Sequence, residues 1–303
     1  MKVLVTGATG FVGGFLMREL VRAGHDVTPA PGSAALDIAD MAGVRSLVAD
    51  VRPDVIAHLA AVASSRDASR DPGRALRTIV GGTIAVTEAA RRASVPPALL
   101  VVSSAEVYAT PAQNDPPLAE GSPLAPRHEY GMLKLAQEVV AIAAAERHDL
   151  PMVVVRPFNH VGPGQPPSSA VAAFAQRIAA VRDGNAHELA VGTIDVERDI
   201  GDVRDFVVAY RLLMEALAAG ELGKPPSVFN VSTGRAVSLR WVIGELCRLA
   251  SVAPDIVVDP ALVRRDDPPR IVGDASLLSR TIEWRPRTEL SATLADVLAQ
   301  YVA

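Results

Sequence analysis

Two residues of a predicted helix, Tyr130 and Lys134, have the types and the spacing for proton transfer. Residues four apart lie one turn apart on one helix face, so the ammonium of Lys134 can lie beside the phenol of Tyr130. A neighbouring positive charge favours the phenolate and lowers the phenol pKa, which would let Tyr130 exchange a proton near neutral pH. By itself, however, such a pair is typical of an exposed amphipathic helix, so a second signal is needed.

A serine at the end of a predicted strand supplies that signal. The apolar residues 100–102 are followed by Ser103 and Ser104, which indicates a buried strand that ends in two hydroxyls. Parallel sheets bind their ligands at the carboxyl ends of the strands. We therefore expect Ser104 to hydrogen-bond a carbonyl oxygen near the Tyr130 and Lys134 pair.

A glycine-rich turn near the start of the chain predicts a phosphate site. Gly7 permits a tight turn, Gly10 lets the backbone approach a pyrophosphate, and Gly13 lets a helix pack closely on the preceding strand. Phe11 and Val12, between the last two glycines, are further candidates for coenzyme contacts. A tight turn without a ligand is the alternative, but the position at the first strand-to-helix junction favours a dinucleotide.

The residues after the second predicted strand do not determine whether the coenzyme is NAD or NADP. No acidic residue ends the segment 26–31 to hold the ribose of NAD, and no arginine follows to hold a 2′-phosphate. We expect weak discrimination, with NADP(H) weakly favoured and NAD(H) possible. Asp37, followed by Ile38, is a candidate for an adenine contact at the end of the next strand. Helix capping just before Met41 is its alternative role.

Strand and helix patterns alternate from the first residue, which indicates right-handed crossovers and a parallel sheet covered on both faces. The predicted strands are Lys2–Thr6, Asp54–Leu59, Leu99–Ser103, Met152–Arg156 and Val228–Val231. The predicted helices are Phe11–Ala23, Met41–Val51, Ala75–Ala93, Tyr130–His148, Ala170–Val181, Val203–Ala219 and Leu239–Ala250. The fold class is thus α/β, a Rossmann-type doubly wound parallel sheet with a smaller C-terminal lobe. Residues 1–157 would form the dinucleotide-binding domain and residues 158–303 mainly the substrate lobe, with some segments returning to the sheet.

Composition excludes several classes of protein. The 303 residues are 49% hydrophobic and 21% charged, with a net charge of -4, so neither disorder nor nucleic-acid binding is expected. The one cysteine, Cys247, cannot form an internal disulfide and reads as a small buried hydrophobe, and no spacing suggests a metal site. With neither a signal peptide nor a membrane span expected, we predict a cytoplasmic protein without membrane contact.

Several strings together carry a family resemblance. TGATGFVG, HLAA at 58–61, SSAEVY at 103–108, YGMLK at 130–134 and RPFNHVGPGQ at 156–165 resemble the extended short-chain dehydrogenases that modify nucleotide sugars. The resemblance covers nearly the whole chain. It is strongest to the GDP-mannose 4,6-dehydratase branch, and especially to reductases of GDP-4-keto-6-deoxy-mannose, through RPFNH, the pair 198–199, DVRD at 202–205 and the tail 263–269.

The resemblance implies roles for particular residues. Tyr130 would be the acid/base, Lys134 would lower the phenol pKa and hold the nicotinamide ribose, and Ser104 would orient the sugar carbonyl. Further coenzyme contacts would come from Gly7, Gly10, Phe11, Val12, Gly13, Asp37, Ile38, Leu59, Ala60, Ala61 and Pro157. The nucleotide sugar would be bound by Ser104, Glu106, Asn159, Arg198, Arg264 and Asp267.

Four positions depart from the family pattern. Ile79 stands where an asparagine is usual, Val62 replaces a polar residue after HLAA, Ala105 separates Ser104 from Glu106, and Ala109 replaces a glycine. None removes the set of serine, tyrosine and lysine. The dehydratases usually place an arginine in the loop after the second strand, and its absence favours a reductase.

Other polar residues have ordinary alternatives. Arg198 could hold a pyrophosphate, or could form a surface salt bridge with Asp199 or Glu197. His58 ends a buried strand and is expected to be a hydrogen-bonded core histidine, whereas His160 is expected to shape the sugar pocket.

The expected activity is NAD(P)H-dependent reduction of the C4 ketone of a nucleotide-linked 4-keto-6-deoxyhexose. A 4,6-dehydratase or 4-epimerase with tightly bound coenzyme is the alternative, and a non-catalytic dinucleotide sensor is a remote one. By resemblance we also expect a homodimer, packed through the helices 75–93 and 130–148, because Leu135, Val139, Ile142 and Ala143 give the second helix a further apolar surface.

Overall fold

The computed structural model describes residues 1–62, 65–222, 227–263 and 267–302. Within these residues, six parallel strands form the main sheet in the order β10-β5-β4-β3-β1-β2. Their bounds are β1 Lys2–Thr6, β2 Asp26–Pro29, β3 Val55–His58, β4 Ala98–Val102, β5 Met152–Pro157 and β10 Ser227–Val231. The chain runs outward from β1 in one direction to β2 and in the other to β3, so the sheet is doubly wound, as predicted.

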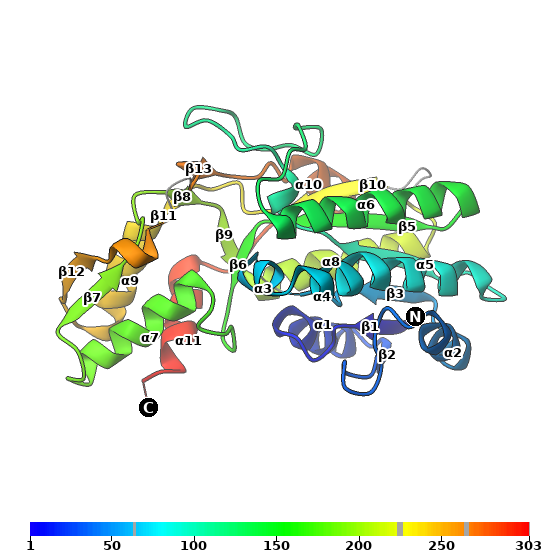
Figure 1. Cartoon of the computed structure of the whole chain (residues 1–303), viewed down its shortest axis with the longest axis horizontal. Coiled ribbons are helices and arrows are strands. Elements are labelled where there is room, and N and C mark those ends of the chain that lie inside the picture. The colour runs from blue at the N-terminus through cyan, green and yellow to red at the C-terminus, as the bar shows by residue number, and fades with distance from the viewer. Residues whose placement is uncertain (63–64, 223–226, 264–266, 303) are drawn as a thin grey trace.

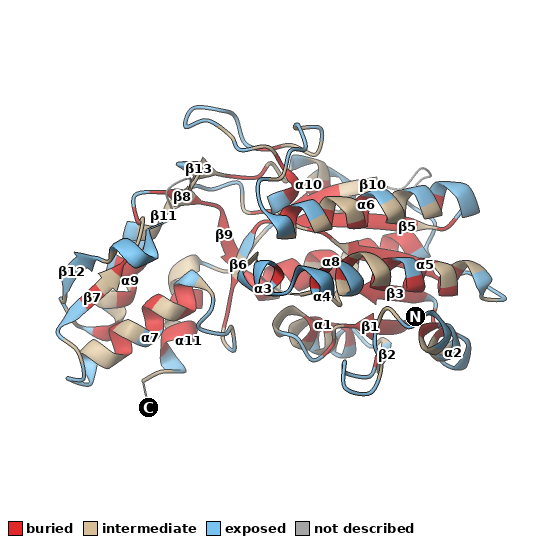
Figure 2. Cartoon of the chain, viewed as in Figure 1, coloured by how far each residue is buried: buried red, intermediate tan, exposed pale blue. Residues whose placement is uncertain are grey.

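The strands are apolar on both sides because helices cover both faces of the sheet. In β1, Val3 and Val5 lie in one hydrophobic core, while Leu4 between them lies in the other. Residues alternate across a strand, so each strand contributes side chains to both cores. Figure 2 shows this burial along the central strands and the inward faces of the helices.

Among the described residues, three helices contribute to the hydrophobic core on each face of the sheet. One core includes residues of α2 Met41–Val51, α5 Gly82–Arg92 and α6 Glu129–His148. The other includes residues of α1 Phe11–Arg22, α8 Val203–Ala218 and α10 Ser276–Ile282. The chain thus returns to the main sheet with α8, β10 and α10 after it has entered the second lobe (Figure 1).

The smaller lobe has a hydrophobic core of its own and lies at one end of the molecule, together with the C-terminus (Figure 1). Its helices are α7 Ala170–Arg182, α9 Leu239–Ala250 and α11 Leu290–Ala299, and β7 Glu188–Val191 pairs with β12 Asp255–Val258. Two small sheets lie toward the main sheet: β11 Val237–Ser238, β8 Glu197–Arg198 and β13 Arg270–Ile271 in one, β6 Asn159–Val161 and β9 Ile200–Asp202 in the other.

A buried carboxylate joins the segments that link the lobe and the sheet. Asp199 is fully buried, and its two oxygens accept hydrogen bonds from the backbone and hydroxyl of Thr233 and from the backbone amides of Gly234 and Gly273. Burial raises the pKa of Asp199, and these hydrogen bonds act in the opposite direction. The three segments are therefore fixed to one another through a single side chain.

The predicted fold class is confirmed, and the main differences lie in local detail. The structure places β1 and α2 at the predicted bounds. The predicted helix Ala75–Ala93 is wrong as a single helix: α4 Pro72–Leu76 leads into a π-helical turn, Arg77–Gly81, and then into α5. Ile79 lies in that turn with its side chain buried, and the extra residue of a π-helical turn has no signature in apolar spacing. No helix within the described residues is long and apolar enough to cross a membrane.

Two adjacent glycines of α1 predict opposite effects on stability. A Cβ on Gly13 would lie 2.1 Å from the carbonyl oxygen of Gly7 and 2.8 Å from Cα of Ala8, whereas a Cβ on Gly14 would approach only the Arg18 guanidinium, at 3.7 Å. We expect Gly13→Ala to lower the free energy of unfolding by about 1–3 kcal/mol, and Gly14→Ala to leave it unchanged or raise it by up to about 1 kcal/mol. Denaturant unfolding of both variants tests this, and equal effects would contradict it.

Candidate active site

The first turn of α6 brings Tyr130 and Lys134 to the carboxyl end of β4. The Nζ of Lys134 lies 5.9 Å from the centroid of the Tyr130 ring and donates a hydrogen bond to the carbonyl oxygen of Val102, the last residue of β4, at 2.7 Å. Ser104 follows two residues later and hydrogen-bonds to the Tyr130 side chain. The structure therefore places the three predicted catalytic residues together.

A short helical turn holds Ser104 in place. Its hydroxyl caps the 3₁₀ turn Ala105–Val107 by accepting a hydrogen bond from the amide of Glu106 at 3.1 Å. Helix α6 packs tightly on this turn at Gly131, where a Cβ would lie 2.3 Å from the carbonyl oxygen of Glu106. The glycine next to Tyr130 thus allows the tyrosine and the serine to approach each other.

Burial shifts the pKa values of both Tyr130 and Lys134. Burial raises the pKa of Tyr130, Glu106 raises it further through its negative charge, and the Ser104 hydrogen bond opposes both. Burial lowers the pKa of Lys134 to about 7, while Glu138 acts to raise it. Burial and Glu106 outweigh the hydrogen bond, so the pKa of the Tyr130 phenol lies above its ordinary value, and a lowering of that pKa by Lys134 stays a prediction. Tyr130 here keeps its proton, as a proton donor requires.

A buried ion pair lies behind Lys134. The Arg156 guanidinium in β5 contacts both oxygens of Glu138 in α6, with the closest pair 2.6 Å apart, and Ser103 donates to the same carboxylate. Arg156 also donates to the hydroxyl of Tyr108 at 3.1 Å. These contacts fix α6 to the ends of β4 and β5.

The glycine turn has the geometry of a phosphate site. Gly7 has a φ of 72°, and a Cβ there would lie within 3.0 Å of the backbone of Leu59 and Ala60, so β1 and the segment after β3 touch at this point. Gly10 is the N-cap of α1, and no side chain in the described part of the chain caps this helix start. The amides of the first helical turn and the helix dipole can therefore receive a pyrophosphate, with Phe11 at the first helical position.

Two other predicted coenzyme residues lie in the loop before α2. Asp37 is exposed and accepts a hydrogen bond from the amide of Ala39, so the expectation that it ends a strand is wrong. The helix cap is Asp40, which accepts from the amide of Ala42. The side chain of Ile38 reaches Gly82 at the start of α5. The loop is irregular because residues 30–40 are mostly small, polar or proline, without strand alternation.

The remaining predicted coenzyme residues end at the same edge of the sheet. Leu59, Ala60 and Ala61 follow β3, and Pro157 is the buried last residue of β5. This edge also carries Ser104, so the proposed coenzyme and catalytic residues share the carboxyl ends of the strands.

Three of the predicted substrate residues come together between the sheet and the lobe. Nη2 of Arg198 forms an ion pair with Oδ1 of Asp267 at 2.6 Å, while its Nη1 donates to the carbonyl oxygens of Glu197 and Pro268. Asn159 donates to the carbonyl oxygen of the neighbouring Asp199 at 3.3 Å. Arg198 thus pairs with a residue far along the chain, whereas the alternatives considered from sequence were its neighbours. Arg264 lies outside the described residues.

Glu106 and the two candidate histidines lie in different surroundings. Glu106 is exposed, and one of its oxygens accepts a hydrogen bond from the hydroxyl of Ser65 at 2.7 Å. His58 is confirmed as a hydrogen-bonded core residue, fully buried between Thr6 and Thr83. His160 hydrogen-bonds to a backbone carbonyl and stacks on Phe11, with ring centroids 6.3 Å apart.

Sequence reasoning missed one side chain that touches Lys134. Gln137, one helical turn after Lys134, accepts a hydrogen bond from the Lys134 Nζ at 2.9 Å and is itself buried. The i, i+3 spacing was a usable signal, but the partner that orients Gln137 is Thr83, on another helix.

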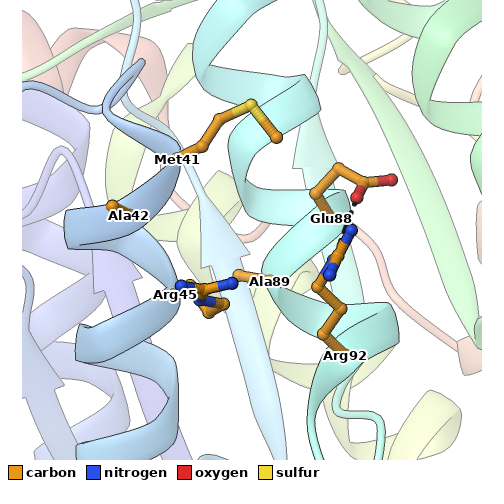
Figure 3. Close-up of a pocket in the computed structure, with 6 residues that line it drawn as sticks. All are labelled: Met41, Ala42, Arg45, Glu88, Ala89 and Arg92. Atoms are coloured by element: carbon orange, nitrogen blue, oxygen red, sulfur yellow. Dashed lines mark hydrogen bonds and ion pairs between the residues drawn. The ribbon is translucent and has the colours of Figure 1, made fainter.

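A small hollow elsewhere in the molecule contains none of the predicted site residues. It lies between α2 and α5 and is lined by Met41, Ala42, Arg45, Glu88, Ala89 and Arg92 (Figure 3). Glu88 is paired there with Arg92. Among the described residues, no group of three or more histidine, cysteine, aspartate or glutamate side chains is placed to hold a metal ion.

The sheet, the uncapped glycine turn and the tyrosine–lysine pair define a nicotinamide-dependent short-chain dehydrogenase. The chain belongs to the NAD dependent epimerase/dehydratase family, whose model matches residues 3–232. This confirms the predicted family and the predicted class of enzyme.

Individual known proteins are similar to this chain over nearly its whole length. The chain is 33% identical over 301 residues to the GDP-6-deoxy-D-mannose reductase of Pseudomonas aeruginosa, covering 99% of this chain and 97% of that protein. Its fold is similar to the solved structure of RMD from P. aeruginosa complexed with NADPH, with a TM-score of 0.88, 31% identity and coverage of 99% and 98%. It is also similar to a Thermus thermophilus UDP-glucose 4-epimerase in complex with NAD, with a TM-score of 0.84, 26% identity and coverage of 99% of each chain.

The buried lysine makes a prediction about stability and pH. The pKa of Lys134 is about 7 in the folded protein and near 10.5 when the chain unfolds, so between these values the unfolded state binds more protons. This group therefore makes the free energy of unfolding rise with pH, by about 2 kcal/mol between pH 7 and pH 9. Denaturant unfolding at both pH values should show that rise in the wild type and in Lys2→Met, and lose it in Lys134→Met. Parallel pH profiles for all three proteins would contradict the assignment.

Proposed function

We propose that this protein reduces the C4 ketone of a nucleotide-linked 4-keto-6-deoxyhexose. The observation that carries the proposal is the meeting of Ser104, Tyr130 and Lys134 at the carboxyl end of β4. A regulatory protein that only senses a dinucleotide needs the glycine turn but none of these three residues.

Each of the three residues has its own role in the proposed reaction. Bound NADPH or NADH supplies the hydride that adds to C4. The hydroxyl of Ser104 donates a hydrogen bond to the carbonyl oxygen, and Tyr130 gives its proton to the same oxygen as the alkoxide forms. Lys134 stabilises the phenolate that remains and holds the nicotinamide ribose. The ketone becomes a secondary alcohol, having gained one hydride and one proton.

We propose that residues 1–157 hold mainly the coenzyme and residues 158–303 mainly the nucleotide sugar. Asn159, Arg198 and Asp267 would contact the nucleotide sugar with Glu106 and Arg264. Since Arg198 and Asp267 are already paired, a pyrophosphate would bind to an arginine whose side chain is held in position. The similarity to a GDP-6-deoxy-D-mannose reductase supports a GDP-linked substrate, and GDP-4-keto-6-deoxymannose is our favoured one.

We propose that both coenzymes are used, with a weak preference for NADPH. The loop after β2 carries no charge at positions 28–35, so it neither repels nor attracts a 2′-phosphate. Hydrogen bonds from Ser33 or from amides near Gly32 would discriminate by roughly tenfold at most. A cytoplasmic location remains a prediction from the sequence.

Replacing the phenol tests the reaction. We expect Tyr130→Phe to lower the turnover of GDP-4-keto-6-deoxymannose by at least about 100-fold, because it removes the proton donor and keeps the ring. Coenzyme binding should change little. The assay follows nicotinamide absorbance with NADPH and NADH separately, and coenzyme binding is measured by fluorescence titration.

Tyr301→Phe is the matched control, because this ring lies in the smaller lobe near the C-terminus, and it should retain wild-type turnover. Near-normal turnover of Tyr130→Phe would refute the role of the phenol. Conversion of a nucleotide sugar without net consumption of the coenzyme would instead identify a dehydratase or an epimerase.

We also propose a homodimer formed through α5 and α6. Of the apolar residues predicted for this surface, Leu135 and Ile142 pack against hydrophobic cores instead. The large apolar side chains exposed on these helices include Ile84 in α5, and Met132 and Val139 in α6, the last with 60% of its surface exposed. We expect the wild type to have twice the monomer mass by light scattering at micromolar concentration, and Val139→Glu to be monomeric, because the new charge would be buried at the interface. Val95→Glu, at a valine after α5 that is even more exposed, should remain dimeric. A monomeric wild type would refute the proposal.

A further inference from the structure

The Nζ of Lys134 is held by two acceptors that belong to different parts of the fold. One is the carbonyl oxygen of Val102 at 2.7 Å, and the other is Oε1 of Gln137 at 2.9 Å. Lys134 and Gln137 are both at least 98% buried. A buried ammonium needs acceptors that cannot turn away, and a glutamine amide can rotate to present its NH₂ group instead. Whatever orients Gln137 therefore determines whether it can hold the lysine.

Thr83 provides that orientation. Its hydroxyl donates its single proton to the carbonyl oxygen of Ile79 at 2.7 Å, so its two other contacts must be donors. These are Nε2 of Gln137 at 2.9 Å and Nε2 of His58 at 3.0 Å. The amide NH₂ of Gln137 therefore faces Thr83, and its oxygen faces Lys134.

The same reasoning determines which ring nitrogen of His58 carries the proton. It also extends the chain of hydrogen bonds to the glycine turn. With its Nε2 protonated, His58 accepts at Nδ1 from the hydroxyl of Thr6, 2.8 Å away, and Thr6 in turn accepts from the amide of Ala60 at 3.2 Å. Burial lowers the pKa of His58 to about 3, in agreement with a neutral ring. Thr6, His58 and Thr83 are all almost fully buried. The result is one directed chain of hydrogen bonds from the coenzyme edge of β1 and β3 to Gln137.

We propose that Gln137 is a positioning residue for the reaction: it holds the ammonium of Lys134 at the end of β4, and Thr83 and His58 hold Gln137 in the orientation that allows this. The inference rests on the proposed function, in which Lys134 acts on Tyr130 and on the coenzyme. It adds a residue that touches neither the substrate nor the coenzyme but determines where the charge of Lys134 lies.

Within the described residues, three titratable groups face Lys134. Tyr130 and Glu138 lie on its own helix, and His58 faces it from β3. His58 stays neutral over the working pH range, and Glu138 is engaged by Arg156. A change at Gln137 should therefore be visible in the titration of Lys134 itself.

That titration can be followed directly, because the chain has only three lysines, at positions 2, 134 and 224. Lysine labelled with ¹³C and ¹⁵N gives one side-chain signal for each, and the signal lost in Lys134→Met identifies residue 134. Gln137→Met keeps the shape and removes the acceptor, so we expect the pKa of Lys134 to fall by about 1. Gln137→Glu places a carboxylate at the same point, so we expect that pKa to rise by at least about 1.

Two threonines of α5 provide a matched pair. Thr83→Val removes the group that orients Gln137, and we expect a smaller fall in the pKa of Lys134. Thr87→Val removes a buried hydroxyl one turn later, which bonds only to backbone carbonyls of its own helix, and we expect no change. If Gln137→Met does not fold, Gln137→Glu and Thr83→Val still decide the question, since they predict shifts in opposite directions.

Kinetics gives a second, separate readout. With GDP-4-keto-6-deoxymannose and NADPH, kcat should fall about tenfold in Gln137→Met and recover in Gln137→Glu. The pH profile of kcat should move to lower pH in Gln137→Met and to higher pH in Gln137→Glu, as the pKa of Lys134 does. An unchanged Lys134 titration in both Gln137 variants would overturn the inference. A wild type that reduces no 4-keto sugar would overturn the proposed function alone, because the titration does not depend on the substrate.

Discussion

The buried amine of Lys134 determines how the candidate active-site end of this molecule is arranged. Its partners are a carbonyl at the end of β4 and a glutamine on its own helix, and an ion pair between β5 and α6 lies just behind it. An ammonium removed from water is tolerated only where acceptors are fixed in advance. The close packing at Gly131 and the buried threonines and histidine can be understood as the conditions for that one charge.

The sequence predicted well the features that depend on local spacing. The i, i+4 relation of Tyr130 and Lys134, the glycines of the first turn and the apolar runs of the strands are each determined within a few residues, so their geometry could be foreseen. The π-helical turn at Ile79 could not, because it changes the register of a helix without changing its composition.

Features that depend on contacts between residues far apart in the sequence could not be predicted. Arg198 pairs with Asp267, 69 residues away, and Gln137 is oriented by Thr83, 54 residues earlier. The sign of the Tyr130 pKa shift also depends on burial and on Glu106, which act together only in the folded chain. The sequence supplies the candidate side chains for the chemistry, whereas tertiary contacts determine their protonation.

The strand order has a consequence for how the protein is made. The sheet is completed on one side by β10, which pairs with β5 although about 70 residues separate them, most of them in the smaller lobe and α8. A ribosome therefore releases β5, an almost entirely apolar strand, long before its neighbour exists. Until residues 227–231 emerge, that edge can pair with other chains. Translation speed and chaperone access across this interval thus bear on the yield of folded protein more than they would for a sheet built in sequence order.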